Sequence, residues 1–220
     1  MTTPRMAPSL AKRFRSGRVS LDFAHTAATD EWIEPELIGD AAGLERWLGH
    51  VLRPMRITTA TPAGTRDNDD PTTSADLTTI ADLTTSARPT DEVTAAHELR
   101  GAILRLARIL SRDNDVDDLP GVDVETVNRY AASPPPAPRM AVDGTAAATT
   151  ATVPQALSVL ARDAVDLFTG PLAHRIRECE ADGCAFLFVD ASRPGTRRWC
   201  SMERCGNLLK VRKHRSTTTP

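Results

Sequence analysis

The chain has 220 residues, which is enough for one medium domain with a small module or for two small domains. Hydrophobic residues make up 40% of it and aromatic residues only 4%, so its core must be mainly aliphatic, which favours helices. The formal net charge of −2 excludes a uniformly basic protein, and no apolar run is long enough to predict a membrane span.

This small net charge conceals a strong asymmetry along the chain. Residues 171–220 contain 10 Lys and Arg against 5 Asp and Glu, a net of +5, which leaves 17 against 24, a net of −7, for residues 1–170. A basic end on an acidic body indicates an anionic partner. Residues 1–18 are also basic and lack the apolar segment of a secretory signal, so we expect a flexible arm there and a cytoplasmic location.

The middle of the chain has the apolar spacing of amphipathic helices in four places. The predicted helices start after Asp40 and cover about 91–112, 123–132 and 154–168. Pro154 suits the first turn of the last helix, and Gly170 suits its C-terminal cap.

Short apolar stretches at 19–24 and 139–153 are candidate strands, and Asp143-Gly144 in the second indicates a hairpin turn. Residues 57–90, rich in Thr, Ala, Asp and Pro, predict a disordered surface loop. We therefore expect an α+β protein whose N-terminal domain, 19–170, is mainly helical with a short β-hairpin.

All four cysteines lie in the basic end, as Cys179-x4-Cys184 and, 15 residues later, Cys200-x4-Cys205. Two close pairs separated in this way are typical of one tetrahedral zinc site. Two disulfides, a redox thiol pair and an iron–sulfur cluster are the alternatives, and the missing export signal and the x4 spacing disfavour the first two. Four protein ligands leave no position for water, so a single Zn²⁺ here would be structural.

The residues around the cysteines predict a small fold at 174–215, followed by a tail at 216–220. Residues 185–189 are a candidate strand, and 197–199 can return antiparallel to it after Pro194-Gly195. A helix is expected from Ser201 to Arg215. A zinc knuckle, a β-hairpin and a helix in this order predict a treble-clef-like zinc finger.

Basic and polar residues are dense in this segment, and such density suits contacts to DNA phosphates. The candidate DNA-binding residues are Arg193, Arg197, Arg198, Asn207, Lys210, Arg212, Lys213 and Arg215. Two less specific interpretations remain. In the first, the basic run is only a solvated tail; in the second, Arg198 and Arg204 offset the negative charge of a zinc thiolate centre. Trp199 is interpreted as a packing residue beside the site, with base stacking as the alternative.

No motif for a phosphate-binding loop, a dinucleotide site or a catalytic nucleophile is present, so we expect no enzyme activity. Asp22 and His25 could form a small polar ligand site. Such a pair more often caps a turn or satisfies buried backbone groups.

The C-terminal segment resembles the CGNR zinc finger family. The similarity rests on Arg177-Glu178-Cys179, Phe188-Val189-Asp190, and the run from Arg197 through Cys200-Ser201-Met202 to Cys205-Gly206-Asn207. The resemblance implies four cysteine ligands to zinc and a module that binds DNA. The chain departs from the family motif at Leu208, where the family has Arg.

The preceding residues resemble the ABATE domain. The similar pieces are residues 21–26, Leu44 with Trp47 and Leu48, Leu99-Arg100, and Asn128, while His25 stands where the family commonly has Asn. The resemblance implies a bacterial, stress-linked transcription regulator. We expect the N-terminal domain to sense a signal, from an effector that the sequence does not identify, or to form a homodimer. The alternative is a zinc-stapled module that binds protein or RNA without sequence-specific DNA binding.

Overall fold

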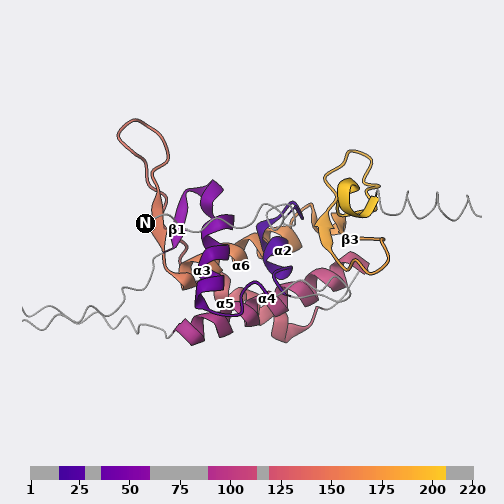
Figure 1. Ribbon diagram of the computed structural model, residues 1–220, viewed down its shortest axis with the longest axis horizontal. Helices are drawn as coiled ribbons and strands as arrows, with labels where there is room; N and C mark the ends of the chain where they lie inside the picture. The colour runs from indigo at the N-terminus through magenta and orange to yellow at the C-terminus, as the bar shows by residue number, and fades with distance from the viewer. Residues whose placement is uncertain (1–14, 28–35, 60–88, 113–118, 207–220) are drawn as a thin grey trace, which may run out of the picture.

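The computed structural model describes residues 15–27, 36–59, 89–112 and 119–206. Helices make up most of these parts, and a small cysteine-rich unit lies at one end of the molecule (Figure 1). The helices are α2 (Val19–Ala24), α3 (Ala41–Val51), α4 (Pro89–Arg112), α5 (Gly121–Ala132) and α6 (Val153–Thr169). In the described parts, no helix is long and apolar enough to cross a membrane.

The four predicted helices are confirmed as α3 to α6, and local signals set where two of them begin. Asp40 caps α3, because its side chain accepts a hydrogen bond from the backbone N–H of Gly43 at 2.7 Å. Thr152 and Gln155 form a reciprocal capping box at the start of α6, whose first turn contains Pro154. Gly170 follows the last residue of α6.

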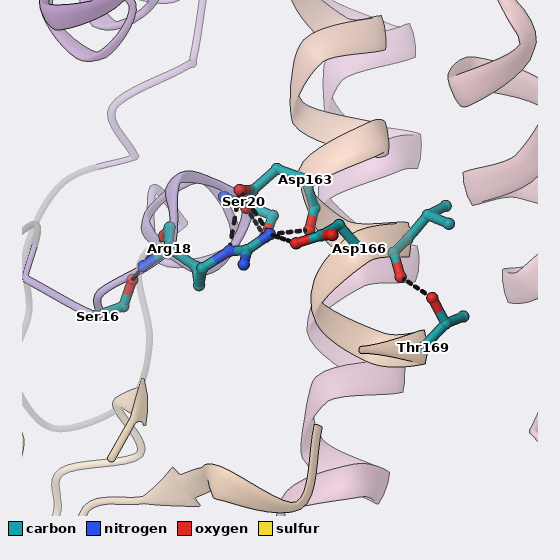
Figure 2. Close-up of polar contacts among 7 residues, drawn as sticks. Ser16, Arg18, Ser20, Asp163, Asp166 and Thr169 are labelled. Carbon is teal, nitrogen blue, oxygen red and sulfur yellow. Dashed lines mark hydrogen bonds and ion pairs between the residues drawn. The ribbon is translucent and has the colours of Figure 1, made fainter. Parts of the chain in front are cut away.

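The predicted strand at 19–24 is wrong, because these residues form the helix α2. Their apolar and polar residues alternate, which is the pattern of a strand, yet Ser20, Leu21, Phe23 and Ala24 are all buried. The carboxylate of Asp163 on α6 accepts hydrogen bonds from the backbone N–H and the hydroxyl of Ser20 (Figure 2). A distant side chain thus satisfies a free N–H of the first helical turn, which residues 19–24 alone do not reveal.

Two short strands lie side by side at the end of the body away from the cysteines. Strand β1 (Ile57–Thr59) pairs in parallel with β2 (Thr149–Ala151), and a short turn of helix, η1 (Arg53–Met55), precedes β1. The predicted hairpin at Asp143-Gly144 is confirmed by backbone bonds between residues 139–141 and 145–147, and it projects from the body (Figure 1).

The predicted disordered loop at 57–90 is corrected at both ends. Residues 57–59 form β1, and residues 89–90 begin α4. Residues 60–88 lie outside the described parts, as do residues 1–14 of the predicted arm.

One hydrophobic core fills the helical body. Among the described residues it contains 18 that are buried, including Trp47 and Phe23, whose ring centres lie 5.3 Å apart. Leu44, Leu48 and Leu99 belong to the same core. The residues that carry the resemblance to the ABATE domain are therefore largely packing residues.

A second buried cluster continues the core into the cysteine-rich unit. The helical body contributes Leu21, Ala107, Leu110 and Leu167, and residues 176–189 contribute Ile176, Leu187 and Val189. Because one apolar cluster includes both parts, the cysteine-rich unit is packed on the body and is not joined to it by a linker alone.

Candidate metal centre

The four cysteine side chains converge on one point, although the two close pairs are separated by 15 residues in the chain. All four sulfur atoms lie within 4.8 Å of one another. The Sγ–Sγ distances are 3.8 Å for Cys184–Cys200, 3.5 Å for Cys200–Cys205 and 3.6 Å for Cys184–Cys205. A zinc ion with four sulfur ligands at about 2.3 Å requires sulfur atoms about 3.8 Å apart. The donor set and its spacing fit one tetrahedral Zn²⁺.

The environment of the sulfur atoms supports a cation at their centre. Cys179, Cys200 and Cys205 are buried, and the backbone N–H of Cys200 donates to Cys179 Sγ at 3.4 Å. Hydrogen bonds with the thiols of Cys184 and Cys200 lower the pKa of Cys179, whereas burial raises the pKa of Cys205. Without a cation, one ionised thiol opposes ionisation of its neighbours; zinc removes this repulsion and releases the remaining protons.

The local scaffold of the site is a hairpin of two very short strands. Strand β3 (Ile176–Glu178) leads to Cys179 and pairs antiparallel with β4 (Leu187–Val189). The predicted partner at 197–199 is wrong, since β4 pairs with β3 and residues 197–199 are not a strand. Pairing with β3 is favoured because it buries Ile176 opposite Val189 in the core shared with the helices.

The helix predicted from Ser201 is present as a single turn, η3 (Met202–Gly206), and it carries the last cysteine. The backbone N–H groups of Cys205 and Gly206 both donate to Ser201 O, at 3.0 and 3.1 Å. Cys205 is buried on this turn, while Met202 is 48% exposed. The rest of the predicted helix, 207–215, with Leu208, lies outside the described parts.

Asp190 organises the loop that leads to the second cysteine pair. Its carboxylate is fully buried and accepts from the backbone N–H groups of Ser192 and Arg197, both at 2.9 Å. Although burial opposes it, these hydrogen bonds hold the pKa of Asp190 below its ordinary value. Gly195 completes the turn with a φ of +65°, which favours glycine.

The predicted DNA-binding residues differ in what their side chains contact. Arg197 donates to the backbone oxygens of Trp199 and Cys200 and lies over the ring of Phe188 at 4.3 Å. Its guanidinium therefore holds the second cysteine pair against β4. Arg198 forms an ion pair with Glu180 at 2.5 Å.

Arg193 is exposed, and the described parts of the chain offer it no hydrogen bond or ion pair. The other five predicted residues lie outside the described parts: Asn207, Lys210, Arg212, Lys213 and Arg215.

His25 connects the helical body directly to β4. Its Nε2 accepts a buried hydrogen bond from the backbone N–H of Leu187 at 2.8 Å, and its ring stacks on Phe186 with centres 4.0 Å apart. The structural interpretation of His25 is therefore confirmed: it satisfies a buried backbone group. Asp22 points elsewhere, accepting from the N–H of Ser16 at 3.0 Å, so the two residues do not form one site.

Two supporting residues had no signal in the sequence. Arg175 donates to the backbone oxygens of Asp190 and Ser192, at 3.1 and 2.7 Å, and so ties β3 to the loop beyond β4. Ser16 O accepts from the N–H of Val189 at 2.7 Å and holds the N-terminal segment along β4. Neither residue belongs to a motif, since both act through backbone groups that only the fold brings near.

The comparisons with protein families agree with this geometry. The model of the CGNR zinc finger matches residues 175–217, which include all four cysteines. The ABATE model, described as "Putative stress-induced transcription regulator", matches residues 17–171. No curated protein matches the chain. The order of the two regions is as the sequence predicted. Because the ABATE model matches more than half of the chain, the chain belongs to the ABATE family, and a CGNR zinc finger follows the ABATE region.

Proposed function

We propose that this protein is a transcription regulator that binds duplex DNA through its zinc finger, in the cytoplasm and without catalysis. The convergence of four thiols supports the proposal most directly, because it leaves the metal no open position. A closed zinc site stabilises a surface and performs no chemistry at the metal. The family description of a transcription regulator makes DNA the partner to test first.

The charges of the finger agree with this role. Arg193 is exposed without a partner in the described parts, and the sequence continues with Lys210, Arg212, Lys213 and Arg215 after the last cysteine. These charges suit phosphate contacts, which dominate the affinity of proteins for DNA. Arg197, by contrast, contributes to the fold of the finger.

The packing of the finger on the helical body suggests a further element of the proposal. The finger packs on the helical body through Leu187 and is further constrained by the hydrogen bond between Leu187 and His25, so it cannot reorient freely. The helical domain therefore fixes the direction in which the DNA-binding surface faces. One finger offers few base contacts, so we propose that two chains bind together when a specific sequence is read.

The experiment is a duplex DNA titration of the full zinc-loaded chain, by fluorescence anisotropy, at salt concentrations from about 50 to 200 mM. Replacing Lys210, Arg212, Lys213 and Arg215 together with Ala should flatten the plot of log affinity against log salt by about 3 to 4 units. The matched control replaces Arg46 and Arg53, two exposed arginines of the helical body, and should leave the slope unchanged.

The proposal fails if the wild-type chain binds duplex DNA no better than the fourfold variant. Binding of single-stranded RNA under the same conditions, with no affinity for the duplex, would instead support an RNA-binding module.

A further inference from the structure

A hollow in the surface beside the second cysteine pair is completed by a residue from the other end of the chain. Residues 196–203 form most of it, including Arg198, Trp199 and Met202, and its volume is about 470 Å³. The remaining lining residue is Arg15, the first residue that the structure describes. No sequence pattern places Arg15 at the finger.

Arg15 reaches the finger because the next three residues are fixed at separate points. Ser16 is buried, and its backbone oxygen accepts from the N–H of Val189 on β4. Its N–H donates to Asp22 at 3.0 Å. Gly17 then turns the chain with a φ of +91°, a backbone conformation that residues other than glycine rarely adopt.

Arg18 provides the third anchor, on α6 (Figure 2). Its guanidinium donates to the carboxylate of Asp163 at 3.0 Å, to the backbone oxygen of Asp163 at 2.9 Å, and to the carboxylate of Asp166 at 2.7 Å. The side chains of Arg18 and Asp163 are only 18% and 19% exposed, so the ion pair between them is partly shielded from solvent, whereas Asp166 is exposed. The two arginines thus differ in role, since Arg18 anchors the segment and Arg15 is exposed at the hollow.

The charges around the hollow leave Arg15 available for an anion. Arg198 is already paired with Glu180 and lies 5.3 Å from the centre of the Trp199 ring. Glu203, an acidic residue, also lines the hollow. Arg15 forms no hydrogen bond or ion pair with Glu203 or with any other residue of the described parts, so its guanidinium donors are not occupied there.

We propose that Arg15 is a DNA contact supplied to the zinc finger by the N-terminal segment, and that it binds a phosphate of duplex DNA. This inference rests on the proposed DNA-binding function and adds to it a residue outside the finger. The guanidinium group suits a phosphate because its planar fork can donate two parallel hydrogen bonds. Lys12 and Arg13 precede Arg15 in the sequence, so further positive charge is connected to the same point.

The test compares Arg15→Ala with wild type in duplex DNA titrations of the full zinc-loaded chain over a salt series. Loss of one phosphate contact should reduce the salt slope by about 0.9, which corresponds to an affinity loss of about eightfold at about 0.1 M salt relative to 1 M. Arg15→Lys should keep most of the slope, because it keeps the charge.

Arg53→Ala is the matched control, since Arg53 is exposed on η1, directly before β1. Strand β1 lies at the opposite end of the molecule from the finger (Figure 1). It should leave the slope and the affinity unchanged. The anchors of the segment are the backbone of Ser16 and the side chain of Arg18, so Arg15→Ala should keep the zinc content and the melting temperature of wild type.

Two outcomes separate this inference from the proposed function. If wild type binds duplex DNA and Arg15→Ala binds with the same slope, the inference is overturned and the proposed function stands. If wild type does not bind duplex DNA, both are overturned.

Discussion

The helical body and the zinc finger of this protein are stabilised in different ways. The body has a core of 18 buried residues, built from helices of up to 24 residues. The finger has strands of three residues each, and within its described part, up to residue 206, its own buried cluster consists of Phe188 and three cysteines. Such a small core cannot offset the loss of conformational entropy on folding. Zinc binding must therefore contribute most of the stability of the finger.

The contrast is incomplete, because the two parts meet in a shared apolar cluster. Ile176, Leu187 and Val189 of the finger pack with Leu21 and Leu167 of the body. The finger thus depends on zinc at one face and on the helices at the other. Substitutions at these different places should separate the two kinds of stabilisation.

The largest effect is expected from Cys200→Ser, which removes one thiolate from the zinc site. Elemental analysis should give about one zinc per wild-type chain and close to none for the variant. Hydrogen exchange should show loss of protection at β3 and β4, because structural zinc contributes roughly 10–16 kcal/mol to folding in finger peptides. Exchange at Leu160, inside the core of the body, should change little. A variant that retains a full zinc content would contradict the assigned ligand set.

Leucine truncations in the two cores should be next in size. Leu160→Ala and Leu187→Ala each remove a fully buried side chain, and each should cost about 2–5 kcal/mol of unfolding free energy. The expected difference lies in zinc release to a chromogenic chelator. Leu187→Ala should accelerate release, because Leu187 lies on the strand of the finger, whereas Leu160→Ala should not. Equal release rates in the two variants would show that the shared cluster does not support the finger.

His25→Ala tests the polar connection between the parts. The substitution leaves the buried N–H of Leu187 without an acceptor and removes the stacking on Phe186, so it should cost about 1–3 kcal/mol. His25→Gln keeps an acceptor at a similar distance along the side chain and should recover part of the loss. Chemical denaturation followed by circular dichroism measures both. If glutamine were no better than alanine, the hydrogen bond would contribute little.

The smallest effect is expected from Asp22→Asn, and it depends on pH. Burial raises the pKa of Asp22 to about 6, with a further contribution from the nearby Asp163 carboxylate. The folded state therefore favours the protonated form, so the unfolding free energy of wild type should fall as pH rises from about 4 to about 6.

Asparagine keeps an oxygen that can accept from Ser16, and it does not titrate. The pH dependence of stability should therefore be weaker in this variant, by on the order of 1 kcal/mol after allowance for partial exposure. Denaturation at pH 4 and at pH 7 gives the comparison, and parallel pH profiles for variant and wild type would exclude this role of Asp22.

Much of the fold could be predicted because its signals are local. Asp40 and the Thr152–Gln155 pair lie within one turn of the helix starts that they cap, so neighbouring residues determine these boundaries. The cysteine spacing predicted the metal ligands for a similar reason, since each close pair forms one knuckle. The family resemblance added the order of the two regions.

The two wrong strand predictions share one physical cause. The alternation of apolar and polar residues in 19–24 predicted a strand. Asp163, far along the chain, instead accepts from a backbone N–H in the first turn of a helix there. Residues 197–199 follow a turn and could pair with β4, but β3 pairs with it because Ile176 is buried in the shared core. In both cases a partner distant in sequence outweighs the local pattern.

The sequence by itself determined the helices α3 to α6, the four zinc ligands and the basic character of the C-terminal end, because spacing and composition carry these features. Only the tertiary structure decided that the finger packs on the helical body, that His25 bonds β4, and that Arg15 lies at the finger. These depend on backbone hydrogen bonds and apolar contacts between segments that are remote in the chain. Such contacts leave no periodic pattern in the residues that make them.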